Sequence, residues 1–173
     1  DSSAIGLVTN IHKIVYDQYD MDSLAIVALN NPSDEKFKNL TYLFSLGKIA
    51  SPLINLEKSE IRGNIKKGII TGKVNLKDEF GNARYIVPYE ITNHPVLPYI
   101  KIGDSLMINK KYWSANADNI IHMNVDFLKG SNLLLSNENE SISIKADSSQ
   151  TNGLPLELSL HQFRLKNISE IMT

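Results

Sequence analysis

The apolar positions of the chain follow two different periods. Between residues 33 and 47, in SDEKFKNLTYLFSLG, they recur every three or four residues, as on one face of a helix. The stretch opens with a Ser that can cap a helix, continues with two acids that suit the helix dipole, and ends at a Gly. The spacing therefore predicts an amphipathic helix over Ser33–Leu46. Its buried face carries Phe37, Leu40, Leu43 and Phe44.

Residues 5–30 leave helix and strand both open. The stretch IGLVTNIHKIVYDQYD mixes the two periods. Ser23–Leu29, in SLAIVAL, is short, continuous and apolar, which favours a buried strand without excluding a helix. The turn residues NNPS then interrupt the pattern.

From Ile49 onward the period is that of β-strands. Gly63, Gly68 and Gly72 are candidate turn or bulge positions between short β-branched runs. A turn at Gly81-Asn82 predicts a hairpin. Its second strand places Tyr85, Val87, Tyr89 and Ile91 on one face. Pro88 has no N–H for a strand ladder, so this strand is predicted to be an edge strand or to contain a bulge.

The stretch LPYIKIGDSLMI (residues 97–108) combines two apolar runs with a Gly-Asp pair between them. We expect Gly103 to occupy a tight turn with positive φ, and Leu106 and Ile108 to point inward after it. Further strands are predicted from similar alternation. They span Asn119–Leu128, Asn132–Ser136, Glu140–Ala146 and the start of the segment that follows Gly153.

These patterns predict a mainly β fold with one or two helices, of β-clip or small β-barrel-like form, with an α+β fold as the alternative. We expect an N-terminal α/β segment over residues 1–47 and a mainly β domain over residues 48–173, which can also be one continuous domain. The boundary is placed where the helical pattern gives way to strands.

Composition narrows the functional classes for this chain of 173 residues. A formal net charge of −1 argues against a nucleic-acid partner, which requires clustered positive charge. The absence of cysteine excludes disulfides, thiolate metal sites and cysteine nucleophiles. No apolar run is long enough to span a membrane. Without a leader, the chain fits a processed protein or a soluble fragment of a membrane-anchored one, in the periplasm or cell envelope.

Motifs that carry chemistry are missing from the sequence. The four histidines are scattered without ligand spacing, and no nucleophile elbow or phosphate loop occurs. An EF-hand loop started at Asp20 fails, because Ala25 and Asn31 stand at its Gly and Glu positions. We therefore expect no metal, no cofactor and no catalytic residue. An enzyme with a dispersed site, such as one made by His94, Asp104 and His122, is the least favoured alternative.

Aromatic residues are the best candidates for a binding surface, because exposed rings on a sheet can stack on sugars or anchor a protein partner. The candidate binding residues are Tyr85, Tyr89, Tyr99 and Trp113. Trp113 is expected to be the most exposed of them, since the surrounding KKYWSANAD is polar.

Residues 43–110 resemble the periplasmic region of Flp/Tad pilus assembly proteins of the CpaB/RcpC type. The matching elements are Gly47–Ala50, Ile65–Thr71, Ala83–Tyr89 and Ile100–Ile108, the last carrying the Gly-Asp pair. The resemblance implies a SAF or β-clip-like region in a non-enzymatic extracytoplasmic component of a pilus or secretion apparatus. Such a component works through protein contacts, with peptidoglycan or another glycan as a further contact. The alternative function is a β-rich module that binds a carbohydrate or another small ligand.

Overall fold

The structure is a computed structural model that describes residues 6–30, 39–50, 55–92, 98–123, 131–146 and 156–162. Within these ranges the chain forms thirteen strands, all antiparallel to their neighbours in one sheet, and no helix. The strands are β1 (Gly6–Tyr16), β2 (Tyr19–Asn30), β3 (Asn39–Ala50), β4 (Asn55–Lys66), β5 (Ile69–Lys77), β6 (Ala83–Thr92), β7 (Tyr99–Ile102), β8 (Leu106–Ile108), β9 (Lys111–Ala115), β10 (Ile121–His122), β11 (Asn132–Asn137), β12 (Glu140–Ala146) and β13 (Leu156–His161).

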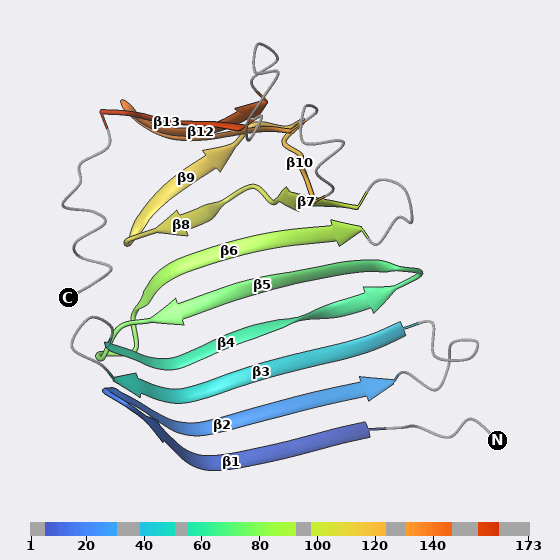
Figure 1. Ribbon diagram of the computed structural model, residues 1–173, viewed down its shortest axis with the longest axis vertical. Helices are drawn as coiled ribbons and strands as arrows, with labels where there is room; N and C mark the ends of the chain where they lie inside the picture. The colour runs from blue at the N-terminus through green and yellow to red at the C-terminus, as the bar shows by residue number, and fades with distance from the viewer. Residues whose placement is uncertain are drawn as a thin grey trace.

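Strands that are consecutive in the chain are mostly neighbours in the sheet. β1 to β6 form a meander, and β6 then pairs with both β7 and β8 (Figure 1). The order continues through β9, β11 and β12 to β13, while β10 pairs with β7. The prediction of a mainly β fold is confirmed. The expected small barrel is wrong, because β1 and β13 lie at opposite ends of an open sheet.

The predicted amphipathic helix is also wrong where the structure describes it. Residues 39–50 form β3, which pairs with β2 on one side and β4 on the other. Leu40, Phe44 and their neighbours fit a period of two as well as a helical period, since Tyr42 and Leu46 are apolar too. The segment forms a strand because it pairs with β2 and β4, through residues that mostly lie far apart in the sequence. Phe44, predicted to be buried, is 42% exposed. Residues 33–38 lie outside the described part of the chain.

Short turns set the register of the meander. Lys67 and Gly68 join β4 to β5 with φ values of 50° and 79°, and Asn109 and Lys110 join β8 to β9 with 48° and 65°. Two consecutive residues with positive φ match the twist of the flanking strands and hold them in register. Gly68 thus occupies a turn, as predicted. Gly63 and Gly72 instead lie opposite each other inside β4 and β5.

The strands of the meander bend along one transverse row. The register on either side places Gly47 between Ser23 and Lys58, whose φ values are 56° and 47°. A Cβ on Gly47 would lie 2.8 Å from the Cβ of Ser23, so only glycine allows this approach. A register shift between β4 and β5 falls at the same row, and Figure 1 shows β1 to β4 bending there.

The two faces of the meander differ sharply in chemistry. The long arms of β1 to β7 are the parts of these strands on one side of the bend, residues 6–11, 24–30, 39–46, 60–66, 69–76, 84–92 and 99–102. One face, called here the inner face, carries no charged residue on these arms. Its residues there are Leu7, Thr9, Ile11, Leu24, Ile26, Ala28, Asn30, Leu40, Tyr42, Phe44, Leu46, Ile61, Gly63, Ile65, Ile70, Gly72, Val74, Leu76, Tyr85, Val87, Tyr89, Ile91, Ile100 and Ile102. The opposite, outer face carries the charges. These are Glu60, Arg62, Lys66, Lys73, Arg84, Glu90 and Lys101.

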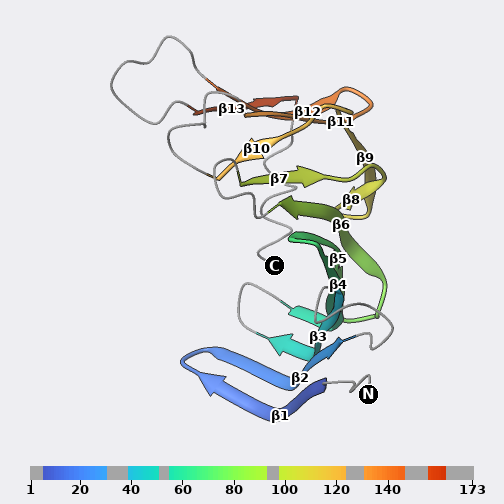
Figure 2. The same ribbon diagram turned by 90° about the vertical axis from the view of Figure 1, so that its right-hand side faces the viewer.

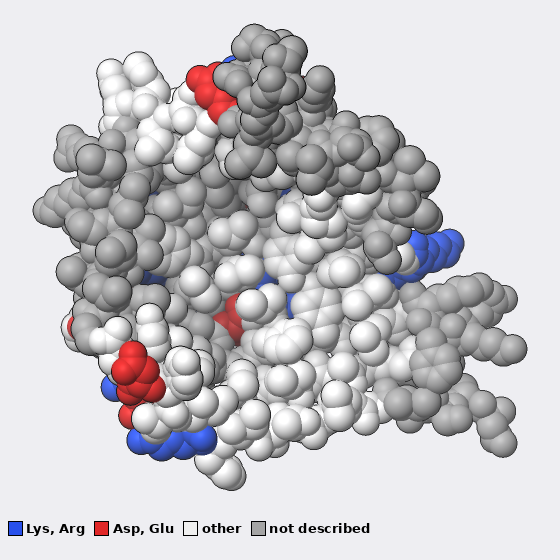
Figure 3. All heavy atoms as spheres, in the orientation of Figure 1, with Lys and Arg blue, Asp and Glu red and all other residues white. Residues whose placement is uncertain are grey.

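The inner face lines an open trough. Figure 2 shows that the two ends of the sheet, β1–β2 and β11–β13, turn to the same side. Figure 3 looks into this side, which is mostly white: the larger charged groups lie at its margins, and one acidic patch with a few basic atoms shows near its middle. The half-exposed apolar side chains of β2 to β6 are therefore presented on a concave surface with few charges.

The core lies at the end of the sheet where it curls most tightly. Leu106, Trp113, Leu133 and Leu135 are buried together there, and all belong to the continuation of the inner face. Partly buried residues pack around this cluster. They are Ile102, Ile108, Ala115, Ile121, Ile142 and Ile144. One continuous apolar face is thus closed into a core at the curled end and left half-exposed over the meander.

Pro88 lies in an interior strand, at a gap between its neighbours. β6 pairs with β7 from Tyr89 onward and with β8 at Ile86, and the chain between those two strands crosses opposite Pro88. The N–H of Gly103 donates to the carbonyl of Pro88 at 2.9 Å. The missing N–H of the proline therefore points to a break in the ladder, so the predicted irregularity is confirmed and the edge position is wrong.

Gly103 is needed for close approach and not for its φ. The residue with positive φ in this turn is Ser105, at 61°, so the expected positive φ of Gly103 is wrong. A Cβ on Gly103 would lie 2.9 Å from the Cβ of Pro88, which a side chain cannot tolerate without a shift of β6. Leu106 is 1% exposed, as predicted, and Ile108 is half-buried.

The later strands agree with the alternation in the sequence. β11, β12 and β13 occupy the three predicted segments after Asn132. The strand predicted over Asn119–Leu128 is present only as β10, and residues 124–130 of that prediction lie outside the described part of the chain.

Candidate binding surface

Two tyrosines face each other across two glycines in the middle of the inner face. Tyr42 on β3, Gly63 on β4, Gly72 on β5 and Tyr89 on β6 are successive partners in the register. The hydroxyl groups of Tyr42 and Tyr89 are 2.7 Å apart, and the Tyr42 hydroxyl also donates to the carbonyl of Thr71 at 3.3 Å. The two rings therefore reach toward each other over strands that have no side chain at this row.

Only glycine fits beneath this tyrosine bridge. A Cβ on Gly63 would lie 2.5 Å from the Tyr42 hydroxyl and 2.7 Å from the Cα of Gly72. A Cβ on Gly72 would lie 2.5 Å from the Tyr42 hydroxyl and 2.6 Å from that of Tyr89. The two glycines have no side chains to pack on this face. The rings of Tyr42 and Tyr89 cover the glycine backbone instead.

The tyrosine bridge is neutral and satisfied. Burial raises the pKa of Tyr42 well above its usual range, and the hydrogen bond to Tyr89 adds to this effect. Each hydroxyl already has a partner within the chain. The centre of the inner face therefore presents apolar carbon atoms and aromatic rings. A partner that covers it does not need to supply a hydrogen bond to either hydroxyl group.

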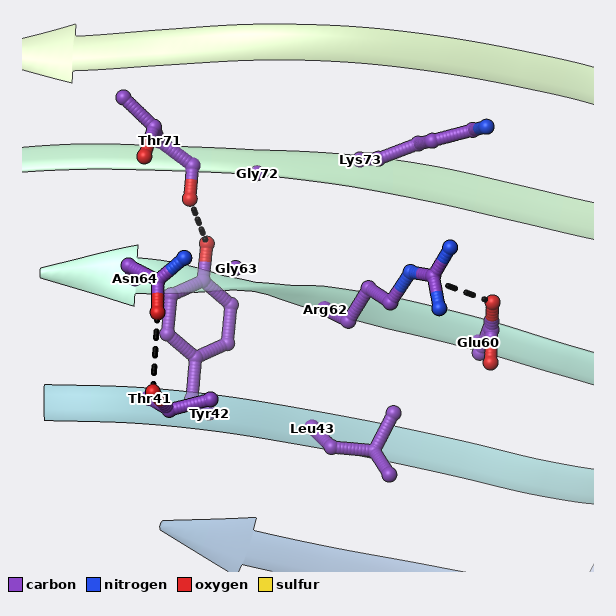
Figure 4. Close-up of a pocket in the computed structure, with 10 residues that line it drawn as sticks. All are labelled: Thr41, Tyr42, Leu43, Glu60, Arg62, Gly63, Asn64, Thr71, Gly72 and Lys73. Atoms are coloured by element: carbon purple, nitrogen blue, oxygen red, sulfur yellow. Dashed lines mark hydrogen bonds and ion pairs between the residues drawn. The ribbon is translucent and has the colours of Figure 1, made fainter. Parts of the chain in front are cut away.

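The reverse side of the same row is a polar hollow. Figure 4 looks onto it from the outer face, since β3 and β4 run in directions opposite to those in Figure 1 while keeping the same order. Thr41 donates to the Oδ1 of Asn64 at 2.9 Å, and the Nε of Arg62 lies 3.6 Å from Glu60. Both pairs face solvent, where such contacts contribute little free energy. Lys73 adds a further positive charge to the lining.

An ion pair fixes the end of the β5–β6 hairpin. The Nζ of Lys110 lies 2.6 Å from Asp78, and the other carboxylate oxygen accepts the N–H groups of Phe80 and Asn82. The ammonium group of Lys110 and these backbone donors hold the pKa of Asp78 below its usual value. The contact ties this hairpin to the β8–β9 turn and has the features of a structural clamp.

The structure separates the four predicted aromatic residues. Tyr85 and Tyr89 share the inner face of β6, as predicted, and the guanidinium of Arg84 lies 5.9 Å from the Tyr85 ring centre. Tyr99 lies on β7, where its hydroxyl is 3.5 Å from Glu90. The expected exposure of Trp113 is wrong, because it is 2% exposed within the core. A groove that combines Trp113 with the tyrosines is therefore not formed.

The residues of the proposed dispersed enzyme site do not form a recognisable centre in the described part of the chain. Asp104 is exposed, His122 is half-buried on β10, and His94 lies outside the described residues. Within those residues, no group of three or more His, Asp or Glu side chains is placed to hold a metal ion. No described helix is long and apolar enough to cross a membrane.

Tyr42 and the paired glycines were not identified from the sequence as parts of a surface. A signal for the glycines was present, since Gly63 and Gly72 are equally spaced about the Lys67-Gly68 turn and must face each other once that turn is assigned. Tyr42 was not recognised because Ser33–Leu46 was predicted to be an amphipathic helix with other residues on its buried face. Its partner on β6 was found because the hairpin there was predicted correctly.

In the part of the chain that the structure describes, these features define an all-β fold with an open antiparallel sheet and a mainly apolar concave face. A scan against models of protein families found no match. Searches of the curated proteins and of the solved structures also found no match.

Proposed function

We propose that the chain is a non-enzymatic extracytoplasmic binding protein of a pilus or secretion apparatus, which holds a partner protein against its inner face. The observation that carries this proposal is the half-exposed apolar surface over β2 to β6. Phe44 is 42% exposed and Ile61 37%, and both belong to a face without charge. Contiguous apolar surface of this kind is typical of interaction sites, because leaving it in water costs free energy that a partner recovers.

The chemistry of the two faces supports a single binding side. The outer face carries every charged residue of the long arms and interacts well with water, whereas the inner face carries none. The resemblance of residues 43–110 to pilus assembly proteins supports the proposal that the partner is a protein of the cell envelope. The absence of nucleophile and ligand patterns in the sequence supports a role without catalysis or a cofactor.

A second candidate function is binding of an elongated apolar small ligand, such as an acyl chain. The tyrosine bridge favours it, since both hydroxyl groups are satisfied within the chain and the row beneath them has no side chain. A ligand with an apolar body would lose no hydrogen bond on this surface. A carbohydrate is less well supported, because Trp113 is unavailable for stacking.

Site-specific photo-crosslinking tests this proposal. A benzophenone amino acid placed at Phe44 is expected to give one discrete protein adduct in cells of the source organism. The matched control is Thr41, an exposed residue of the same strand on the outer face, which should give none. An adduct of lipid mass at Phe44 would favour the second candidate. No adduct at Phe44, or the same adduct at both positions, would contradict both.

A further inference from the structure

The outer edge of β1 has no partner strand in the part of the chain that the structure describes. β1 spans Gly6–Tyr16 and pairs only with β2. Natural sheets protect such edges with proline, charge, bulges or a covering segment, because unpaired N–H and C=O groups are a template for another strand. From Gly6 to His12 this strand contains neither proline nor a charged residue.

The direction of the free backbone groups follows from the register of the sheet. The N–H of Gly103 donates to the carbonyl of Pro88, so the backbone groups of Pro88 point toward β7. Alternation across the unshifted registers from this row of β6 to β1 makes Leu7 part of a hydrogen-bonded pair with β2. The backbone N–H and C=O groups of Val8 and Asn10 therefore point away from the sheet.

The side chains at this edge are apolar and exposed on both faces. Leu7 is 59% exposed and Ile11 37% on the inner face, and Val8 is 60% exposed on the outer face. The inner face thus reaches the edge without a polar rim. An added strand would bury these side chains as well as the free backbone groups.

We propose that β1 pairs antiparallel with β1 of a second copy of this chain, about a two-fold axis at Thr9. Leu7 then faces Ile11 of the second copy on the inner side, and Val8 faces Asn10 on the outer side. No charged side chain meets a like charge, because the segment has none. The axis lies perpendicular to the sheet, so both copies keep their inner faces on one side and form one trough of double length.

The substitution Val8→Pro tests this interface without touching the internal ladder. It removes an N–H that points outward, so the monomer keeps all of its β1–β2 hydrogen bonds. The measurement is the molar mass by sedimentation equilibrium. We expect a dimer for the natural chain, and weakening of dimerisation by about tenfold or more in Val8→Pro, as expected from losing one or two strand-pairing hydrogen bonds. The control Val8→Thr keeps the N–H and should remain a dimer.

A disulfide test keeps the proposal falsifiable if Val8→Pro fails to fold. The chain has no cysteine, so Thr9→Cys introduces a single thiol that oxidation should link across the two-fold axis. Leu158→Cys is the control, since it is 64% exposed on β13 at the opposite edge. Four results would overturn the proposal: a monomeric natural chain, masses that grow without limit, dimerisation unaffected by Val8→Pro, or crosslinking at Leu158→Cys and not at Thr9→Cys.

Discussion

The substitution Trp113→Ala is expected to lower the free energy of unfolding by about 3–5 kcal/mol, the typical cost of removing a buried aromatic side chain. Trp113, on β9, is 2% exposed and packs with Leu106 of β8 and with Leu133 and Leu135 of β11. Removing its ring leaves a cavity at the place where the sheet curls on itself, and the strands around it cannot close without losing their register.

Urea unfolding followed by circular dichroism measures this effect, because the only tryptophan is lost in the variant and fluorescence cannot be compared. The control is Phe80→Ala, which removes an aromatic ring that is 79% exposed in the β5–β6 turn. Its cost should stay within about 0.5 kcal/mol. Equal costs for the two substitutions would show that the core is not centred on Trp113.

The second large effect is expected for Asn119→Ala, at about 3–5 kcal/mol, since each buried polar group left without a partner costs roughly 1–3 kcal/mol. Asn119 is 1% exposed. Its Oδ1 accepts the N–H of Ile102 at 2.7 Å, and its Nδ2 donates to the carbonyls of Ile102 at 2.9 Å and of Asn116 at 2.6 Å. The side chain thus takes the place of a strand partner at the end of β7.

The control for this variant is Asn139→Ala, which changes an exposed asparagine of the β11–β12 turn and should cost less than about 0.5 kcal/mol. Thermal and urea unfolding report both variants. Hydrogen exchange adds a local reading, because the amide of Ile102 should lose its protection in Asn119→Ala before the rest of the core does. Unchanged protection at Ile102 would contradict the assigned role.

The strands that sequence patterns predicted well are those with clear period-two alternation and turn residues at both ends. β11 and β12 are examples, joined by a short polar turn. The helix prediction failed because apolar residues at almost every position of Leu40–Leu46 satisfy both periods. Only the long-range pairing of β3 with β2 and β4 distinguishes them, and a local pattern contains no information on it.

Exposure was misjudged at Trp113 for a related reason. Its immediate neighbours Tyr112 and Ser114 are exposed, and they made the whole segment look like surface. In a strand, adjacent side chains point to opposite faces, so polar neighbours are compatible with a buried residue between them. Of the two tyrosines in the bridge, only Tyr89 was identified from the sequence, by its alternation on β6. Tyr42 could be placed opposite it only from the pairing of four strands.

The central claim is that one apolar face is closed at the curled end of the sheet and open over the meander. Thiol labelling tests it most directly, because the chain has no cysteine of its own. Phe44→Cys should react with a soluble maleimide in the native protein, whereas Leu133→Cys, at a position that is 4% exposed, should react only after denaturant is added. Protection of Phe44→Cys equal to that of Leu133→Cys would show that the inner face is covered, and would contradict the account.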